Sequence, residues 1–132
     1  GMDIVEALVT KNKQQYTRPL RIFEHGNAIT SDLPNVDLIL CRDMFVHLDF
    51  NSIFATLKNF KRSGSRYLLV TVHPLIQHNQ NIPIGEWRAL DLQKAPFNFP
   101  APLCLLPDRE REQDVEACTK YLGLWLLDDI LV

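Results

Sequence analysis

Two short apolar runs joined by one amphipathic segment constrain the fold of this chain most strongly. Val36–Cys41 and Arg66–Val72 are nearly continuous in apolar residues, which is typical of strands that are buried on both faces, as in parallel sheets. Between them, Leu48–Phe60 carries apolar residues at helical spacing, and Asp49 or Asn51 can cap its start. A strand, a helix and a strand joined by short turns predict a parallel βαβ unit.

The segment that precedes this unit contains shorter signals. Residues 3–16 fit a helix that starts with an Asp-x-x-Glu pattern, with Asp3 as the N-cap. Residues 21–24 fit a short strand, and residues 25–27 fit a turn. Gly1 stands ahead of a methionine and is interpreted as an expression scar, so it is left out of the fold reasoning.

The rest of the chain is a long excursion followed by a hairpin. Residues 73–102 hold five of the eight prolines and no sustained periodicity, which is typical of a lid-like excursion or of disorder, and the interleaved aromatic residues favour an ordered one. Leu103–Leu106 and Tyr121–Leu127 are strand candidates, and the charged segment Asp108–Glu116 between them predicts an antiparallel hairpin with a long tip. We therefore expect one α/β domain over residues 1–132 that ends in a β-hairpin over residues 103–132.

Composition argues against several classes of function. A hydrophobic content of 46% with 23% charged residues is typical of a globular protein, and a net charge of -2 gives no reason to expect nucleic acid as a partner. No apolar run approaches the ~20 residues that a membrane helix needs. Cys41, Cys104 and Cys118 have no metal-ligand spacing, so we expect no metal site, and scattered thiols suit a reducing cytoplasm.

Several phrases along the chain form a set that carries a family resemblance. They are Asp37–Asp43, reading Asp-Leu-Ile-Leu-Cys-Arg-Asp, then Val46–Leu48, Asn59–Leu69, Gly85–Leu92, Ala95–Phe97 and Leu122–Trp125. The set resembles the fourth conserved motif and the later segments of class I S-adenosylmethionine-dependent methyltransferases, in a bacterial subgroup. The resemblance covers nearly all of the chain from about Asp3. It implies an incomplete Rossmann-like methyltransferase sheet, with a parallel βαβ core that ends in an antiparallel hairpin.

One feature that the resemblance implies is missing from the sequence. The family's sheet has the strand order 3-2-1-4-5-7-6, and its first strand ends in a glycine-rich turn whose backbone approaches the methionine part of the cofactor. The sequence has five glycines and no two of them have G-x-G spacing. No strand is predicted before Asp3 for such a turn to follow. We therefore expect a truncated methyltransferase-like domain that binds S-adenosylmethionine weakly or not at all.

The resemblance assigns six residues to the cofactor site. They are Asp3, Asn27, Ala28, Cys41, Arg42 and Asp43. Asp3 would bind the ribose hydroxyls, the segment at Asn27 would lie beside the adenine, and Cys41–Asp43 would border the methionine end. Each has a plain structural alternative, since Asp3 can cap a helix, Asn27 can form a turn, and the charged pair after Cys41 can lie on the surface.

Candidates for the chemistry itself are weaker. His47 and His73 are candidate general bases because imidazole titrates near neutrality, and each is otherwise an ordinary structural histidine. The resemblance implies a substrate pocket for a small-molecule or protein methyl acceptor. Its candidate residues, which can equally cover the sheet as core, are Trp87, Arg88, Phe97 and Phe99.

A sheet without its central strand predicts an exposed edge at Val36–Cys41. Unpaired strand edges promote association, so either Arg21–Glu24 or a second copy of the chain is expected to cover it. The alternative to a methyltransferase is therefore a non-catalytic remnant that persists as a self-associating α/β module.

Overall fold

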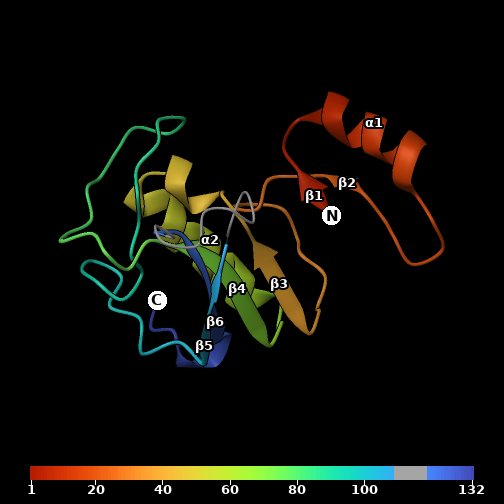
Figure 1. The fold of residues 1–132 in the computed structure, drawn as a ribbon. Helices are drawn as coiled ribbons and strands as arrows, with labels where there is room; N and C mark the ends of the chain where they lie inside the picture. The colour runs from red at the N-terminus through yellow and green to blue at the C-terminus, as the bar shows by residue number, and fades with distance from the viewer. Residues whose placement is uncertain (109–118) are drawn as a thin grey trace.

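A mixed four-stranded sheet forms the centre of the structure (Figure 1). Its order is β3 (Leu38–Cys41), β4 (Tyr67–Val72), β6 (Tyr121–Leu126) and β5 (Cys104–Pro107). β3 and β4 are parallel, and β6 is antiparallel to both β4 and β5. The structure is a computed structural model that describes residues 1–108 and 119–132. The predicted parallel pair and the predicted terminal hairpin are confirmed, and nearly all of the predicted charged tip lies outside the described residues.

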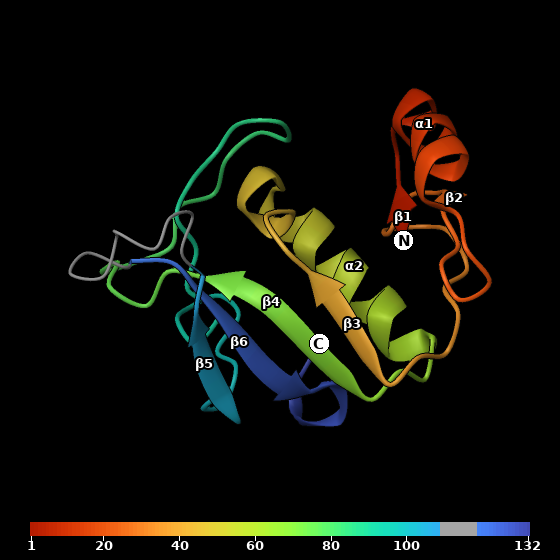
Figure 2. The same ribbon diagram turned by 45° about the vertical axis from the view of Figure 1, so that its right-hand side comes forward.

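The helix of the βαβ unit is α2 (Phe50–Arg62), which follows a short 3-10 helix, η1 (Phe45–His47). Asp49 is its N-cap and accepts a hydrogen bond from the backbone N–H of Ser52 at 2.6 Å. The apolar side of α2 is fully buried through Ile53 and Leu57 and packs on one face of the sheet (Figure 2). The predicted helix is confirmed, with a start two residues later than the apolar periodicity indicated.

The N-terminal segment differs from the prediction. Asp3 is not a helix cap but lies in β1 (Met2–Asp3), which pairs in parallel with β2 (Glu24–His25) as a separate two-stranded sheet. The helix α1 (Glu6–Tyr16) begins after Val5 without a side-chain cap. Oδ1 of Asp3 instead accepts a hydrogen bond from the backbone N–H of Val5 at 2.8 Å. The local sequence pattern could not predict β1, because a two-residue strand forms only through its pairing with a distant segment.

Burial of β3 also differs from the prediction. Leu38 is 43% exposed and Leu40 is 59% exposed, whereas both were expected to be buried. The reason is that α2 covers one face only and that, among the described residues, no strand pairs with the outer edge of β3. Of the two alternatives expected to cover this edge, the one with residues 21–24 is wrong, since the strand in that region, β2, pairs with β1. The alternative with a second copy of the chain stays a prediction.

Residues 73–102 contain neither helix nor strand, yet they supply much of the core. Leu90 and Leu92 are fully buried, and Phe97 and Phe99 are nearly so. The ring of Phe99 packs edge-on against Trp125 of β6 with centroids 5.4 Å apart. The segment is therefore packed against the sheet as part of the core.

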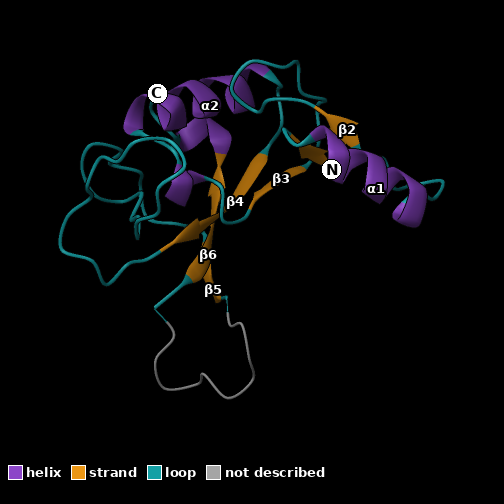
Figure 3. Cartoon of the chain, turned by 90° about the horizontal axis from the view of Figure 1, so that it is seen from above, coloured by secondary structure: helices purple, strands orange, loops and turns teal. Residues whose placement is uncertain are grey.

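The chain ends in a second 3-10 helix, η2 (Leu127–Asp129). The view from above shows α2 on one side of the sheet and α1, β1 and β2 beyond the β3 edge (Figure 3). Neither of the described α-helices has the length and apolar character needed to cross a membrane.

Candidate functional site

A cavity of about 570 Å³ lies at the carboxyl ends of β1 and β3, and we call it the carboxyl-end cavity. Ligands of open α/β sheets bind at this end of the strands, and small-molecule pockets span roughly 300–1,000 Å³. Its lining includes all six residues assigned to the cofactor, together with one candidate base: Asp3, Asn27, Ala28, Cys41, Arg42, Asp43 and His47. Three segments that are distant in sequence therefore meet at one cavity.

Asp3 is half-buried at the end of β1. Its Oδ1 is engaged by the Val5 backbone, and among the described residues no hydrogen bond reaches Oδ2. A carboxylate oxygen with free lone pairs can accept a hydrogen bond from a ligand hydroxyl. Asp3 thus combines a local structural bond, which is not a helix cap, with capacity to accept a hydrogen bond from a ligand.

Asn27 forms a turn, as its structural alternative states. Its Oδ1 accepts a hydrogen bond from the backbone N–H of Ile29 at 2.9 Å, and its own N–H donates to Oγ of Ser31 at 2.9 Å. The buried Asn59 of α2 then donates through Nδ2 to the carbonyls of Ala28 and Ser31, both at 2.8 Å. The amide oxygen of Asn27 is therefore occupied, and the turn faces the cavity as a fixed wall attached to α2.

Cys41 is a buried wall residue whose thiol is free. Burial raises the pKa of Cys41 to about 12, although a hydrogen bond with the Phe45 backbone opposes the shift. The thiolate is the nucleophilic form of cysteine, so Cys41 is unreactive near neutral pH. Cys41 therefore contributes to the shape of the cavity wall and supplies no nucleophile.

Arg42 and Asp43 belong to a four-residue ion cluster, defined by Arg42, Asp43, Asp108 and Lys120. Arg42 donates through Nε and Nη2 to both carboxylate oxygens of Asp108, at 2.9 and 3.1 Å. Lys120 Nζ lies 2.8 Å from Asp43 and 3.3 Å from Asp108. The predicted Arg42–Asp43 surface pair is present and, at 3.6 Å, is the longest of these contacts.

Two members of this ion cluster, Asp108 and Lys120, have shifted pKa values. Partial burial alone would raise the pKa of Asp108, but hydrogen bonds from Arg42 and Lys120 outweigh it and the pKa is lowered. Partial burial would lower the pKa of Lys120, and the carboxylates of Asp43 and Asp108 reverse that effect so that its pKa is raised. Sequence reasoning missed Asp108 and Lys120, whose one visible signal was their place at the two ends of the charged hairpin tip.

Asp43 has an unusual backbone conformation, with φ at 55°. Non-glycine residues enter this left-handed region rarely, and Asp is one of the few that tolerate it. Its N–H donates to Oγ1 of Thr71 in β4 at 2.9 Å. The sheet therefore stabilises the sharp turn after β3 and fixes where the Asp43 carboxylate meets the cavity.

His47 is exposed and lines the same cavity from η1. Its Nδ1 lies 3.0 Å from the carbonyl oxygen of Glu86. A carbonyl can only accept, so this bond assigns the hydrogen to Nδ1 and leaves Nε2 as the acceptor of the neutral ring. In that tautomer Nε2 can receive a proton, which is what a general base requires.

The other candidate base, His73, is outside the lining of this cavity. It is buried, its Nδ1 accepts from the backbone N–H of Leu90 at 3.3 Å, and its ring meets Trp87 edge-on. Burial lowers the pKa of His73 and keeps the ring neutral. The structural alternative therefore describes His73 better than a catalytic role does.

None of the four substrate-pocket candidates is among the described lining residues of the carboxyl-end cavity. Phe97 and Phe99 are core residues, and Trp87 is 61% exposed. Arg88 is buried, and its guanidinium donates to the carbonyls of Gln80, Phe45 and Leu48 at 2.7 to 3.0 Å. Arg88 thus satisfies backbone groups around η1, which is a structural task.

Among the described residues, no group of three or more His, Cys, Asp or Glu side chains could hold a metal ion. Comparison of the sequence with models of protein families found no match, and comparison with curated proteins found none.

Proposed function

We propose that this chain forms part of a domain like those of the S-adenosylmethionine-dependent methyltransferases, with the carboxyl-end cavity as its nucleoside site. The observation that carries the proposal is the meeting of Asp3, the turn at Asn27 and the segment Cys41–Asp43 around one cavity. The sequence resemblance, which contains no spatial information, assigns these three segments to one cofactor.

The order of strands supports the proposal. β3, β4, β6 and β5 follow one another as strands 4, 5, 7 and 6 of the family's sheet would, with the same parallel and antiparallel relations. β2 and β1 correspond to strands 3 and 2 in the same sense. In this proposal the two sheets together correspond to six strands of an incomplete Rossmann-like sheet.

The cavity fits the cofactor only in part. Asp3 offers a carboxylate for a ribose diol, and Ala28 offers a small side chain beside an adenine ring. A glycine-rich turn is needed where the backbone approaches the methionine part, and Gly26 is the single glycine among the described lining residues. We therefore propose weak nucleoside binding by this chain and derive no methyl-transfer step.

Chemical-shift mapping with S-adenosylhomocysteine tests the proposal. Backbone amide shifts are expected to change at Asp3, Ala28 and Arg42, with a millimolar dissociation constant. D3N is the matched variant, because an amide oxygen retains the bond to Val5 while the negative charge is lost, and it should weaken binding severalfold. D32N, at a fully exposed position outside the cavity lining, is the control. Shift changes elsewhere on the surface, or none at all, would reject the nucleoside site.

A second candidate is the self-associating module without catalysis, and the exposure of Leu38 and Leu40 on β3 favours it. Sedimentation velocity over a range of protein concentrations tests this candidate. A concentration-dependent dimer that L40K abolishes would support it. A monomer at every concentration would leave the methyltransferase-like domain as the better account.

A further inference from the structure

One part of the carboxyl-end cavity is lined by side chains that the nucleoside assignment leaves unused. Met44, His47 and Leu48 lie along η1 and its flanks, and Ile84 comes from the excursion after β4. Gly85 N–H donates to the carbonyl oxygen of His47 at 2.9 Å, so Ile84 lies against the same short helix. The four lining residues, which we call the η1 corner, are three apolar side chains and one imidazole.

Hydrogen bonds between η1 and the excursion hold the η1 corner together. The carbonyl oxygens of Phe45–Leu48 all accept hydrogen bonds from Gly85 or Arg88, at 2.7 to 3.1 Å. Two of these bonds come from the guanidinium of Arg88, which is buried. Glu86 N–H donates to Pro83 O at 3.2 Å across a tight turn, and the φ of 95° at Gly85 is the conformation that such a turn reserves for glycine. The corner is therefore formed before any ligand binds.

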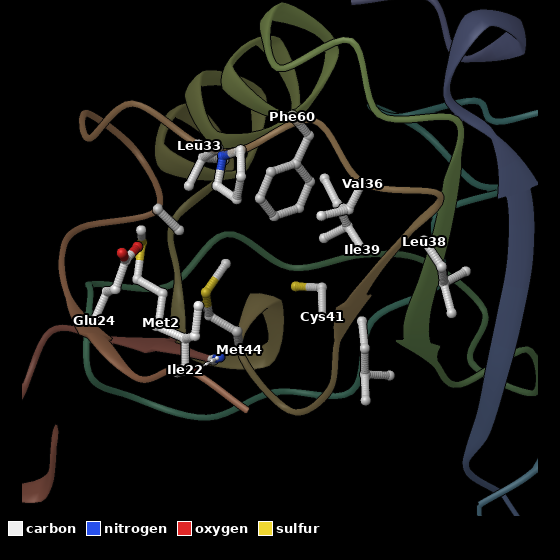
Figure 4. A pocket seen from close by; sticks show the side chains of 14 residues that line it. Met2, Ile22, Glu24, Leu33, Val36, Leu38, Ile39, Cys41, Met44 and Phe60 are labelled. Carbon is white, nitrogen blue, oxygen red and sulfur yellow. Dashed lines mark hydrogen bonds between the residues drawn. The ribbon is translucent and has the colours of Figure 1, made fainter. Parts of the chain in front are cut away.

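The apolar side chains of the η1 corner differ in exposure. Met44 and Leu48 pack against the buried core, whereas Ile84 is 61% exposed. Met44 also faces, with Cys41, a second and apolar cavity of about 450 Å³ between β1 and β3, so its side chain bounds the corner on that side (Figure 4). A ligand that covers Ile84 would remove apolar surface from water, which favours binding of a molecule with a hydrocarbon part.

The polar group of the η1 corner is a hydrogen-bond acceptor. Nδ1 of His47 donates its hydrogen to the carbonyl oxygen of Glu86 at 3.0 Å, so Nε2 is the acceptor of the neutral ring. Among the described residues, no hydrogen bond reaches Nε2. A hydroxyl group on a ligand is a donor of matching chemistry for this nitrogen.

The charges in the cavity narrow the class of ligand further. Arg42 and Asp43 line the cavity as members of the ion cluster, where each has a partner of opposite charge. Asp3 carries a carboxylate with no ion pair among the described residues. A carboxylate or phosphate ligand would be repelled by Asp3 and would have to compete for Arg42. A neutral ligand avoids both costs.

We propose that the η1 corner binds a neutral, largely apolar small molecule through one hydroxyl group, which donates a hydrogen bond to Nε2 of His47. Met44, Leu48 and Ile84 contact the hydrocarbon part of this molecule. The inference rests on the proposed function in one respect, which is that it makes the hydroxyl compound the methyl acceptor beside the nucleoside. The binding itself follows from the corner alone.

Titration of the full chain with 4-methylphenol tests the proposal. Backbone amide shifts should change at Met44, Leu48 and Ile84, and the nitrogen resonance of His47 Nε2 should shift as it accepts the hydrogen bond. Toluene lacks the hydroxyl group and should bind about fivefold more weakly, because it loses one neutral hydrogen bond, and it should leave the Nε2 resonance in place. Equal affinities for the two compounds, or amide shifts that exclude the η1 corner, would overturn the proposal.

Variants at His47 separate its hydrogen bond from its structural role. H47N retains an amide N–H for the carbonyl of Glu86 but places no group at Nε2, so it should bind 4-methylphenol and toluene equally. H47Q carries an amide oxygen that reaches the position of Nε2 and should restore part of the preference. Retention of the full preference in H47N would overturn the proposal.

A matched pair of variants tests the apolar contact. I84D should weaken binding of both compounds severalfold, because a carboxylate replaces apolar surface in the η1 corner. L75D, in the same excursion at a 69% exposed position outside the described lining, should bind both as the wild type does. Equal losses in I84D and L75D would overturn the proposal.

A second ligand separates this inference from the proposed function. S-adenosylhomocysteine should shift the amides of Asp3 and Ala28 and should not displace 4-methylphenol from the η1 corner. Absence of the nucleoside shifts, with His47-dependent binding of 4-methylphenol intact, would reject the proposed function and support the hydroxyl site. Nucleoside shifts without 4-methylphenol binding, or mutual exclusion of the two ligands, would overturn the hydroxyl site.

Discussion

Lys120 Nζ lies 2.8 Å from Oδ2 of Asp43, although 77 positions separate the two residues in sequence. Lys120 immediately precedes β6, and Asp43 follows β3 at the edge of the carboxyl-end cavity. The contact therefore connects the base of the terminal hairpin to the turn that borders the candidate nucleoside site.

Replacing Lys120 with alanine should show how much this contact stabilises the folded chain. K120A is expected to lower the free energy of unfolding by about 1 kcal/mol, the upper range for a partly exposed ion pair, because two carboxylates lose their shared partner. Urea denaturation measures the difference. R62A is the matched control, since its partner Asp32 is fully exposed, and it should change nothing measurable. Equal effects of K120A and R62A would argue that the ion cluster has no structural role.

The segment 73–102 should behave as core in a stability experiment. L90A is expected to cost about 2–5 kcal/mol, as L68A in β4 should, because both side chains are fully buried. L131A, at an exposed position, is the control and should cost far less. A small loss for L90A beside a large one for L68A would mean that the segment opens independently of the sheet, as a lid does.

His73 should make stability depend on pH. Its pKa in the folded chain is lowered by burial from the ordinary value of 6.5, so the unfolded chain binds a proton more readily. The contribution of the neutral ring is present above about pH 6.5 and is lost as pH falls from there through the lowered folded pKa. H73N retains an acceptor for the Leu90 N–H without titrating near neutrality. Thermal unfolding of the variant should vary less with pH between about pH 7 and pH 5 than that of the wild type; parallel curves would contradict this assignment.

The thiols should differ in reactivity. Cys41 is buried with a pKa raised to about 12, and Cys104 is exposed. A variant with C104S and C118S should therefore react with a thiol reagent only at the rate of unfolding, whereas C41S with C118S should react at once. Rapid labelling of Cys41 in the folded protein would show that the wall of the carboxyl-end cavity opens.

Sequence periodicity was sufficient for the elements that bury an apolar face against a neighbour. α2 and β4 follow their residue patterns closely, and the hairpin strands β5 and β6 were expected from short apolar runs. The two-residue strands β1 and β2 have no periodic signal, because they are defined by a partner more than twenty residues away. Burial of β3 was overestimated for a related reason, since a run of apolar residues does not reveal whether a covering partner exists.

The residues of the candidate site also include some that the sequence indicated and some that it did not. The six residues that were assigned to the cofactor through motif resemblance do line one cavity. The ion partners Asp108 and Lys120 were missed, because charges at a hairpin base are ordinary in sequence and acquire meaning only when the sheet brings them to β3. Arg88, a substrate-pocket candidate through the resemblance, donates to backbone carbonyls, which agrees with the structural alternative that the sequence left open.

The affinity of the chain for the methyl donor tests the central claim most directly. Calorimetric titration with S-adenosylmethionine and with S-adenosylhomocysteine should give weak heats that do not saturate in the micromolar range, because the described lining of the cavity offers the Asp3 carboxylate and a single glycine, Gly26, in place of a glycine-rich turn. Saturable micromolar binding of either ligand would contradict the account, since it would require a complete cofactor site within these residues.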